Sequence, residues 1–374
     1  MHQAYNLYIN EVYSKNLEST EMNENIMATV VIPAYNAAEF IEDAVKSCFN
    51  QTYRPMETIV VNDGSTDATA NKVKVLADAL CSSGFELRLM DVGKNMGAAN
   101  ALNGGFSNAK GAYVCWLSAD DIFIDREKIK KQIGYMKRTE ADWSYFRDFY
   151  SGTNTSTARL VKSSYLPRLR ILDPLFIRDS DLRLAMLLFR NPVNGSSVMI
   201  KQDCAEVYGQ FDPSMRNVDA DGDLWMRYSA FKLKLCALKG APVFLREHGK
   251  QTSKRKEYMM YGSELTRIRI LRALEKKGTL VKVIKKFAPF LPIILKAKKH
   301  FERPLVSEFL FDYIIENKNK FNYFLFKSAK KALSDVKNHR NYQSIDKNKF
   351  AEDLELLTRS DTFTKFEATF KELV

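Results

Sequence analysis

Long hydrophobic runs are missing from this sequence of 374 residues. No stretch of about 18 apolar residues occurs, so we predict no transmembrane helix. Residues 1–26 are polar and lack the apolar core of a secretion signal, and we expect them to form an N-terminal extension. The overall composition, 45% hydrophobic and 27% charged, is ordinary for a soluble protein. At this length we expect more than one region.

Cysteine is scarce and scattered. The five cysteines, Cys48, Cys81, Cys115, Cys204 and Cys236, lack the spacing of a metal site. Cys48 and Cys115 fall on expected core faces, and we interpret all five as reduced thiols of a cytoplasmic protein.

Acidic residues are absent from one basic segment, residues 280–300. Residues 1–250 hold 30 Lys and Arg against 30 Asp and Glu, so the net charge of +12 comes entirely from residues 251–374. In 280–300, six lysines interleave with apolar residues, and Pro289 and Pro292 divide the segment into two short helices or one kinked helix. Such a segment can lie on an anionic membrane surface, at the inner face of the membrane. It can equally be a core helix whose lysine stems reach out to water.

A recognisable nucleic-acid-binding module is also absent. An isoelectric point of 9.2 is weak evidence by itself, so we do not expect nucleic acid as a partner. A nucleic-acid-binding protein that uses the basic C-terminal region is kept as an alternative.

Paired carboxylates are the most informative feature that is present. Asp120 and Asp121 follow the apolar run 112–117, which reads as a buried strand. Adjacent carboxylates at a strand end suit a hard divalent cation such as Mg²⁺ or Mn²⁺, which prefers oxygen ligands and shares them with substrate phosphates. The alternative is an acidic turn before a helix over 125–138.

Strands and helices alternate through the first half of the chain. Strands are predicted at 27–32, 58–61, 86–90 and 112–117, each followed by a polar loop and helical spacing. This pattern predicts an α/β fold with a doubly wound, mostly parallel sheet flanked by helices. Its ligands are expected at the carboxyl ends of the strands, where every polar cluster lies.

Several motifs, in order, resemble glycosyltransferase family 2, enzymes of GT-A fold. The resemblance covers about residues 28–253. The first motifs are Pro33-Ala34-Tyr35-Asn36, the hexapeptide Asn62 to Asp67, the set Asn95, Gly97, Ala101, Asn103 and Gly105, and the acidic pair Asp120-Asp121. The later ones are Gly209, Phe211 and Asp212, then Asp223 to Arg227, and finally Arg246 and His248 before Thr252 and Ser253. Three positions depart from the family pattern: Ser118, Ala220 and Leu102.

The resemblance implies a nucleotide-sugar pocket and a metal. It assigns nucleotide contacts to Pro33, Tyr35, Asn36, Asp63, Asn95, Gly97 and Asp120, and metal contacts for Mn²⁺ or Mg²⁺ to Asp120, Asp121 and His248. Tyr35 would lie against the base and Asp63 at its edge. An aspartate accepts from the N3–H of uracil but meets an acceptor in cytosine, so a UDP-sugar is the expected donor.

The resemblance also implies a general base and an acceptor site. Asp221 aligns with the family's catalytic base, before a helix predicted over 224–235, and Asp219 lies close enough in sequence to replace it. The acceptor, a glycan or a lipid-linked glycan, is expected over Asn194, Gly195 and Ser196, before a strand at 198–200.

The resulting expectation is an inverting, hexosyltransferase-type enzyme of surface polysaccharide or glycoconjugate synthesis. We expect a GT-A domain over 27–255 and a helical, basic C-terminal region over 256–374. A sugar-phosphate nucleotidyltransferase would need a glycine-rich phosphate loop after its first strand, and Pro33 to Asn36 cannot supply one. A degenerate, non-catalytic family member remains an alternative because of Ser118 and Ala220.

Overall fold

The computed structural model describes residues 26–80, 84–216, 218–251 and 254–373. Its strands are β1 Ala28–Ala34, β2 Met56–Asn62, β3 Phe85–Asp91, β4 Tyr113–Trp116, β5 Ile122–Phe123, β6 Trp143–Phe146, β7 Asp148–Gly152, β8 Arg159–Lys162, β9 Met199–Lys201, β10 Leu235–Leu238 and β11 Val243–Arg246. The helices of the first part are α2 Ile41–Phe49, α3 Thr69–Leu80, α4 Ala98–Ser107, α5 Lys128–Thr139, α6 Asp173–Arg178, α7 Ser180–Leu187, α8 Gln202–Tyr208 and α9 Ala220–Ala230. The later helices are α10 Lys256–Lys276, α11 Leu280–Phe287, α12 Leu291–Lys296, α13 Pro304–Glu316, α14 Tyr323–Lys337, α15 Arg340–Gln343, α16 Lys347–Thr358 and α17 Asp361–Leu373.

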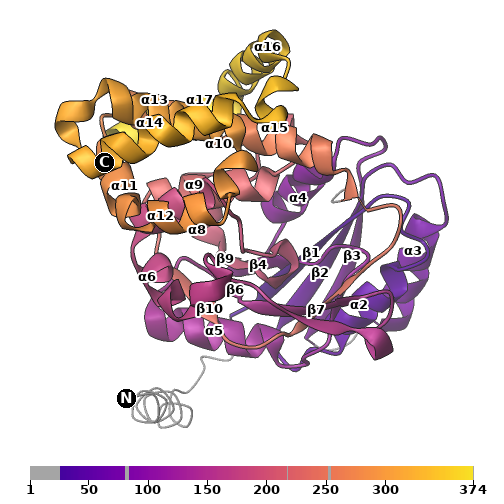
Figure 1. Cartoon of the computed structure of the whole chain (residues 1–374). Helices are drawn as coiled ribbons and strands as arrows, with labels where there is room; N and C mark the ends of the chain where they lie inside the picture. The colour runs from indigo at the N-terminus through magenta and orange to yellow at the C-terminus, as the bar shows by residue number, and fades with distance from the viewer. Residues whose placement is uncertain (1–25, 81–83, 217, 252–253, 374) are drawn as a thin grey trace.

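A mixed, mostly parallel sheet of seven strands forms the centre of the molecule (Figure 1). Its strand order is β10-β6-β9-β4-β1-β2-β3, and only β9 runs antiparallel to its neighbours. The strands β1, β2 and β4 are buried along nearly their whole length because helices cover both faces of the sheet. The predicted α/β fold with a mostly parallel, helix-flanked sheet is therefore confirmed.

Alternate residues of β1 enter two different hydrophobic cores. Val30 and Ile32 pack with α2, α3 and α5 on one face of the sheet. Val31 packs with α4 and the helices behind it on the other face. A small second sheet, in the order β5-β11-β7-β8, lies beside the carboxyl ends of the central strands and carries Arg246 at the end of β11.

The predicted elements agree with the observed ones except around α9. The four predicted strands correspond to β1 to β4, and the strand expected at 198–200 is β9. The helix predicted over 224–235 instead begins at Ala220 and ends at Ala230. The chain leaves the helix because Leu235 begins β10, whose pairing with β6 overrides the helical spacing of the sequence.

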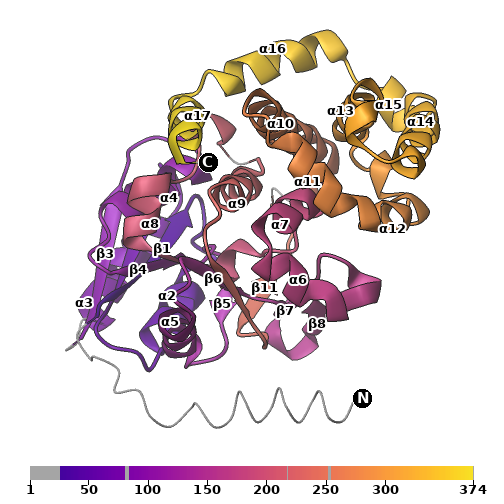
Figure 2. The same ribbon diagram turned by 90° about the vertical axis from the view of Figure 1, so that its left-hand side faces the viewer.

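The helices from α10 onward share the core of the α4 face. Residues of α10, α11, α13, α14, α16 and α17 belong to the same buried cluster as α4, α7 and α9. Figure 2 shows α17 beside α4 and α8, at the far end of the chain from them in sequence. The predicted helical C-terminal region is confirmed, and it packs directly on the sheet domain.

The apolar side of residues 280–300 lies inside the protein. The segment forms α11 and α12, and Leu280, Val283, Ile284 and Phe287 are at most 3% exposed. Phe287 stacks on Phe189 with ring centroids 5.0 Å apart. A membrane contact through this apolar face was the wrong alternative, because packing against α7 already removes these side chains from water. The core-helix alternative describes the segment, with its lysines pointing outward.

Two further expectations from the sequence concern the cysteines and the absence of membrane-spanning helices. Cys48, Cys115, Cys204 and Cys236 are free and buried, whereas Cys81, Thr252, Ser253 and residues 1–25 lie outside the described residues. Along the described chain, no helix combines the length and the hydrophobicity that crossing a membrane requires.

Candidate active site

A cavity of about 680 Å³ opens at the carboxyl ends of β1, β2 and β4. Parallel strands bring their ends to one edge of the sheet, so motifs distant in sequence meet there. Six of the seven residues predicted to bind nucleotide line this cavity: Pro33, Tyr35, Asn36, Asp63, Asn95 and Asp120. Gly97 does not line it, although the adjacent Ala98 does. Tyr35 is half exposed and offers its ring to the cavity rim.

Asn36 links the loop after β1 to the loop after β2 by hydrogen bonds. Its backbone N–H donates to Ser65 Oγ at 2.9 Å, and its Oδ1 accepts from the Thr66 N–H at 2.8 Å. Asn36 adopts a left-handed conformation with φ of 49°, which asparagine tolerates better than most residues. Asp67 adds a link by accepting from the Ala38 N–H at 3.1 Å. One wall of the cavity is therefore preformed by the family motifs themselves.

Asp63 holds the loop between β3 and α4 in place by accepting hydrogen bonds from two of its backbone N–H groups. The side chain is 3% exposed, and its two oxygens accept from the N–H groups of Met96, at 2.8 Å, and Gly97, at 2.9 Å. Gly97 has a φ of 93° and lies close to the backbone of Arg216, so a side chain there would be strained and crowded. Each carboxylate oxygen retains a second lone pair for a ligand. Asp63 thus has a structural role besides the predicted contact with a base.

Asp120 and His248 are hydrogen-bonded to each other on the cavity wall. His248 Nε2 lies 2.8 Å from Asp120 Oδ2, and the Phe40 ring flanks the imidazole at 4.9 Å. Arg246 holds this corner by donating from Nε to the Asp120 carbonyl at 3.2 Å and from Nη2 to Asp43 at 2.8 Å. The side chains of His248 and Asp120 line the cavity and are 20% and 24% exposed.

Asp121 points away from the cavity. It is 5% exposed and accepts from Ser196 Oγ at 2.7 Å and from the Arg246 N–H at 3.3 Å. Burial and the neighbouring Asp120 carboxylate raise the pKa of Asp121 well above its ordinary value. Of the predicted acidic pair, only Asp120 lines the cavity, because Ala119 and Asp120 form a turn, closed by the Asp121 N–H donating to the Ser118 carbonyl at 3.0 Å, after which the Asp121 side chain is buried.

Two of the residues predicted to bind the acceptor, Gly195 and Ser196, pack against the end of β4 and the loop that carries Asp121. Ser196, besides contacting Asp121, accepts from the Ser118 N–H at 3.1 Å. Gly195 packs on the Trp116 ring so closely that a Cβ would lie 2.3 Å from it. Trp116, Trp225 and Trp143 stack in one column, with centroids 5.9 and 4.8 Å apart. The third predicted residue, Asn194, has a buried Oδ1 without a partner among the described residues.

Asp221 stands in the first turn of α9 and is half buried. Burial, followed by the charge of Asp219, raises the pKa of Asp221 to about 6. A carboxylate with a pKa near the operating pH is suited to general-base catalysis. Asp221 does not line the 680 Å³ cavity.

Sequence reasoning missed two arginines of α10 that neutralise the acids around Asp221. Arg267 donates to Asp219, which also accepts from Thr266 Oγ1 at 2.9 Å. Arg269 is fully buried between Asp212, at 2.8 Å, and Asp223, at 2.5 Å. The spacing Arg-x-Arg on one helix, opposite alternating aspartates on another, was the available signal. Of the three acids in 219–223, Asp221 alone has no ion pair among the described residues.

A metal would find two protein ligands in the cavity. Within the described part of the chain, no group of three or more His, Cys, Asp and Glu side chains is arranged around a common point. Asp120 and His248 offer one oxygen and one nitrogen on the cavity wall, and a divalent cation completes its shell with substrate phosphate oxygens and water. The residues present therefore fit a metal shared with a diphosphate.

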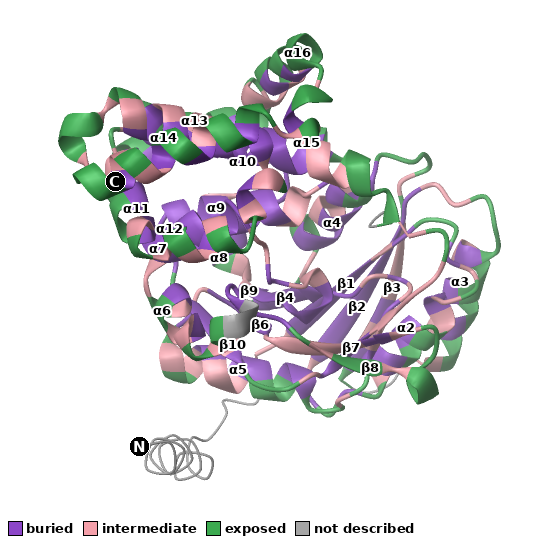
Figure 3. Cartoon of the chain, viewed as in Figure 1, coloured by how far each residue is buried: buried purple, intermediate pink, exposed green. Residues whose placement is uncertain are grey.

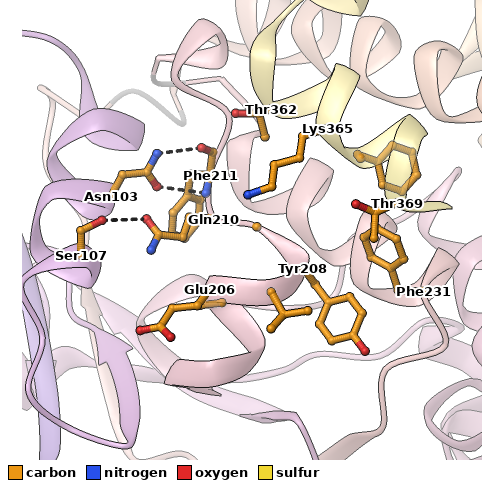
Figure 4. Close-up of a pocket in the computed structure, with 14 residues that line it drawn as sticks. Asn103, Ser107, Glu206, Tyr208, Gln210, Phe211, Phe231, Thr362, Lys365 and Thr369 are labelled. Carbon is orange, nitrogen blue, oxygen red and sulfur yellow. Dashed lines mark hydrogen bonds between the residues drawn. The ribbon is translucent and has the colours of Figure 1, made fainter. Parts of the chain in front are cut away.

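A second cleft, of about 300 Å³, lies between α8 and α17 (Figure 4). One wall is the loop that carries Phe211, which exchanges two hydrogen bonds with Asn103 of α4, at 2.8 and 3.0 Å. The opposite wall is α17 with Lys365 and Phe366. This cleft contains none of the predicted site residues, so it is separate from the nucleotide cavity.

Comparison with known proteins decides the family. Residues 29–194 match the family model described as glycosyl transferase family 2. Residues 29–194 belong to glycosyltransferase family 2. An uncharacterised glycosyltransferase of Rickettsia prowazekii is 30% identical over 55% of this chain and 61% of its own length. One of Haemophilus influenzae is 28% identical over 69% of this chain and 77% of its own length. TuaG of Bacillus subtilis, named for teichuronic acid biosynthesis, is 31% identical over 32% of this chain and 45% of its own length.

Solved structures of low sequence identity share the family 2 fold. The crystal structure of S. aureus TarS 1-349 in complex with UDP-GlcNAc has a TM-score of 0.52 and 14% identity, covering 87% of this chain and 92% of that one. The predicted GT-A fold is thereby confirmed. The match with this chain covers only part of the first relatives, and in the Rickettsia prowazekii protein it covers 61% of the length.

Proposed function

We propose that this chain is an inverting glycosyltransferase that moves a sugar from a UDP-sugar to a hydroxyl of a glycan or lipid-linked glycan. The observation that carries this proposal is the cavity at the carboxyl ends of β1, β2 and β4, where Tyr35, Asp63, Asp120 and His248 meet. A sugar nucleotide presents a base, which Tyr35 and Asp63 could contact, and a diphosphate, which a metal held by Asp120 and His248 could contact. The name of TuaG and the UDP-GlcNAc of the TarS structure agree with surface-polymer synthesis from a UDP-sugar.

In this proposal, the base lies on Tyr35 and its edge meets Asp63. Asp120 and His248 would hold Mn²⁺ or Mg²⁺, which when bound neutralises the charge that develops on the departing diphosphate. Asp121 keeps Asp120 in place through Ser196 and the Arg246 backbone. The 680 Å³ cavity is large enough to bury most of a nucleotide.

Asp221 would remove the proton of the acceptor hydroxyl as the new glycosidic bond forms. Its free carboxylate and raised pKa favour it over Asp219, whose oxygen is bound by Arg267. In-line attack on an α-linked donor gives a β-linked product. Asn194, beside the largely buried turn Gly195–Ser197, is the remaining candidate for an acceptor contact.

A donor screen tests the proposal directly. Purified protein is incubated with UDP-, GDP- and CDP-sugars, with Mn²⁺ or with EDTA, and release of the nucleoside diphosphate is measured. We expect slow hydrolysis of one or more UDP-sugars that needs the metal. Binding of UDP-sugars without hydrolysis or transfer would instead indicate the degenerate, non-catalytic family member. Equal preference for GDP-sugars would contradict the proposed contact between Asp63 and uracil.

A further inference from the structure

An exposed stripe on α14 combines aromatic and basic side chains. Tyr323 and Phe324, at the start of the helix, are 76% and 66% exposed and are the two most exposed aromatic residues among those described. The other members of the stripe are exposed lysines: Lys327, Lys330 and Lys331 of α14, and Lys318 and Lys320 of the turn Lys318–Lys320 that precedes the helix. We call this set the aromatic-basic stripe.

The aromatic-basic stripe is the outer side of a helix whose inner side is core. Leu325, Ala329, Ala332 and Val336 of α14 are buried against α13 and its neighbours. Figure 3 shows α14 with both buried and exposed sides. Since the fold already has its apolar contacts on the inner side, stability does not explain two adjacent aromatic rings in water.

The charge of the stripe is uncompensated. Residues 317–331 contain five lysines and no acid; the nearest acids in sequence are Glu316 and Asp335. Among the described residues, none of the five lysines has an acidic partner, whereas Lys337 further along α14 lies 3.7 Å from both Glu308 and Asp312. Positive charge is therefore concentrated beside the exposed rings.

We propose that the aromatic-basic stripe binds an anionic membrane surface. Lysines attract anionic headgroups, while Tyr and Phe enter the interface between headgroups and acyl chains. Adjacent helical residues project about 100° apart, so Tyr323 and Phe324 cannot form one flat platform for stacked bases. All five cations are lysines, which hold phosphates as point charges and lack the fork of arginine that reads nucleic-acid bases. This surface does not depend on the transferase activity.

Vesicle binding by the full-length protein and a matched pair of variants tests the proposal. The stripe variant carries Lys327→Gln, Lys330→Gln and Lys331→Gln. The control carries Lys72→Gln, Lys74→Gln and Lys130→Gln, which remove the same charge from exposed sites on α3 and α5. Co-sedimentation with phosphatidylcholine vesicles, with and without 30% phosphatidylserine, gives partition coefficients. Melting temperatures confirm that both variants are folded.

We expect the native protein and the control to bind only the anionic vesicles. The stripe variant should bind them roughly 100-fold more weakly, because each lysine near an anionic surface contributes about a factor of five. Equal losses in the stripe variant and the control would overturn the proposal, since net charge alone would then explain binding. So would no binding of the native protein to anionic vesicles.

Phe324→Trp reports whether the rings enter the interface. The three native tryptophans are at most 5% exposed, so a new indole dominates any change in emission. We expect a blue shift with anionic vesicles for Phe324→Trp and none for Tyr258→Trp, a tyrosine of α10 that is 47% exposed. Fluorescence polarisation with a labelled oligonucleotide supplies the last arm. If the stripe variant loses oligonucleotide binding but keeps vesicle binding, the surface serves nucleic acid and the membrane proposal is rejected.

Discussion

Arg267 of α10 is ion-paired with Asp219, two residues before Asp221. The contact joins the C-terminal helices to the first turn of α9, and Arg269 joins them again through Asp223. The C-terminal region thereby neutralises the acids on either side of the proposed base. The C-terminal region therefore contributes directly to the surroundings of the proposed base.

Replacing Asp221 should separate chemistry from donor binding. Asp221→Asn preserves the shape of the side chain but removes its basicity, so we expect sugar transfer to fall by about 10² to 10⁴ with nearly unchanged UDP-sugar affinity. Asp219→Asn should reduce transfer less and lower the melting temperature, since it weakens the contact with Arg267. Steady-state rates and calorimetric titrations measure these effects. Loss of transfer in Asp219→Asn alone would shift the base assignment by two residues.

The pH dependence of transfer should report Asp221. The carboxylate must be deprotonated to accept a proton, and its pKa is raised to about 6. We therefore expect kcat/KM to fall about tenfold per pH unit below pH 6 and to level off above it. Removing the Asp219 charge should move this profile to lower pH, because a like charge raises the pKa of its neighbour. A profile unchanged by Asp219→Asn would contradict the coupling.

Arg269 should be essential for stability. Arg269→Met leaves the buried carboxylate of Asp212 without a cation and leaves Asp223 with Arg227 alone, and breaking such a buried pair typically costs about 3–5 kcal/mol. Arg272→Met on the exposed side of the same helix is the matched control and should change the free energy of unfolding by less than about 0.5 kcal/mol. Urea unfolding compares the two. By the same reasoning, a chain truncated after Tyr261 loses Arg267 and Arg269 and should not fold stably.

The two acids after β4 should respond differently to mutation. Asp120→Ala is expected to abolish the Mn²⁺ dependence of UDP binding with little change in melting temperature, because its side chain is only partly buried. Asp121→Ala should lower the melting temperature, since Ser196 and Arg246 lose a buried acceptor at about 1–3 kcal/mol. Retention of the metal dependence in Asp120→Ala would identify another ligand.

Glu264 of α10 should make stability depend on pH. Burial raises its pKa from 4.5 to about 7, so the folded state binds a proton more tightly than the unfolded state. The free energy of unfolding should therefore fall as pH rises from 4.5 to 7, by up to about 3 kcal/mol. Glu264→Gln should reduce this slope and leave the part that comes from Asp121 and Asp221, whereas Glu275→Gln, exposed on the same helix, should leave it unchanged. Chemical denaturation across this pH range provides the measurement.

The sequence by itself determined the sheet and the membership of the nucleotide cavity. Continuous apolar runs specify buried parallel strands, and parallel strands bring their carboxyl ends to one edge. The loops that carry Tyr35, Asp63 and Asp120 therefore lie together at this edge, whatever the direction of each side chain. The strand pattern was enough to predict that polar loops gather at this edge, and the resemblance to the family supplied the roles proposed for individual residues.

Only the tertiary structure decided which neighbours face the ligand and which face the core. Asp120 and Asp121 are chemically identical in sequence, but contacts with Ser196 and Arg246 turn Asp121 inward. Arg267 and Arg269 reach Asp219 and Asp223 across 48 and 46 residues of chain, and only the packing of α10 on α9 brings the two spaced patterns together. Interleaved lysines and apolar residues suit both a membrane and a core, and it is the packing of α11 on α7 that selects the core. Long-range packing chooses among the environments that a local pattern allows.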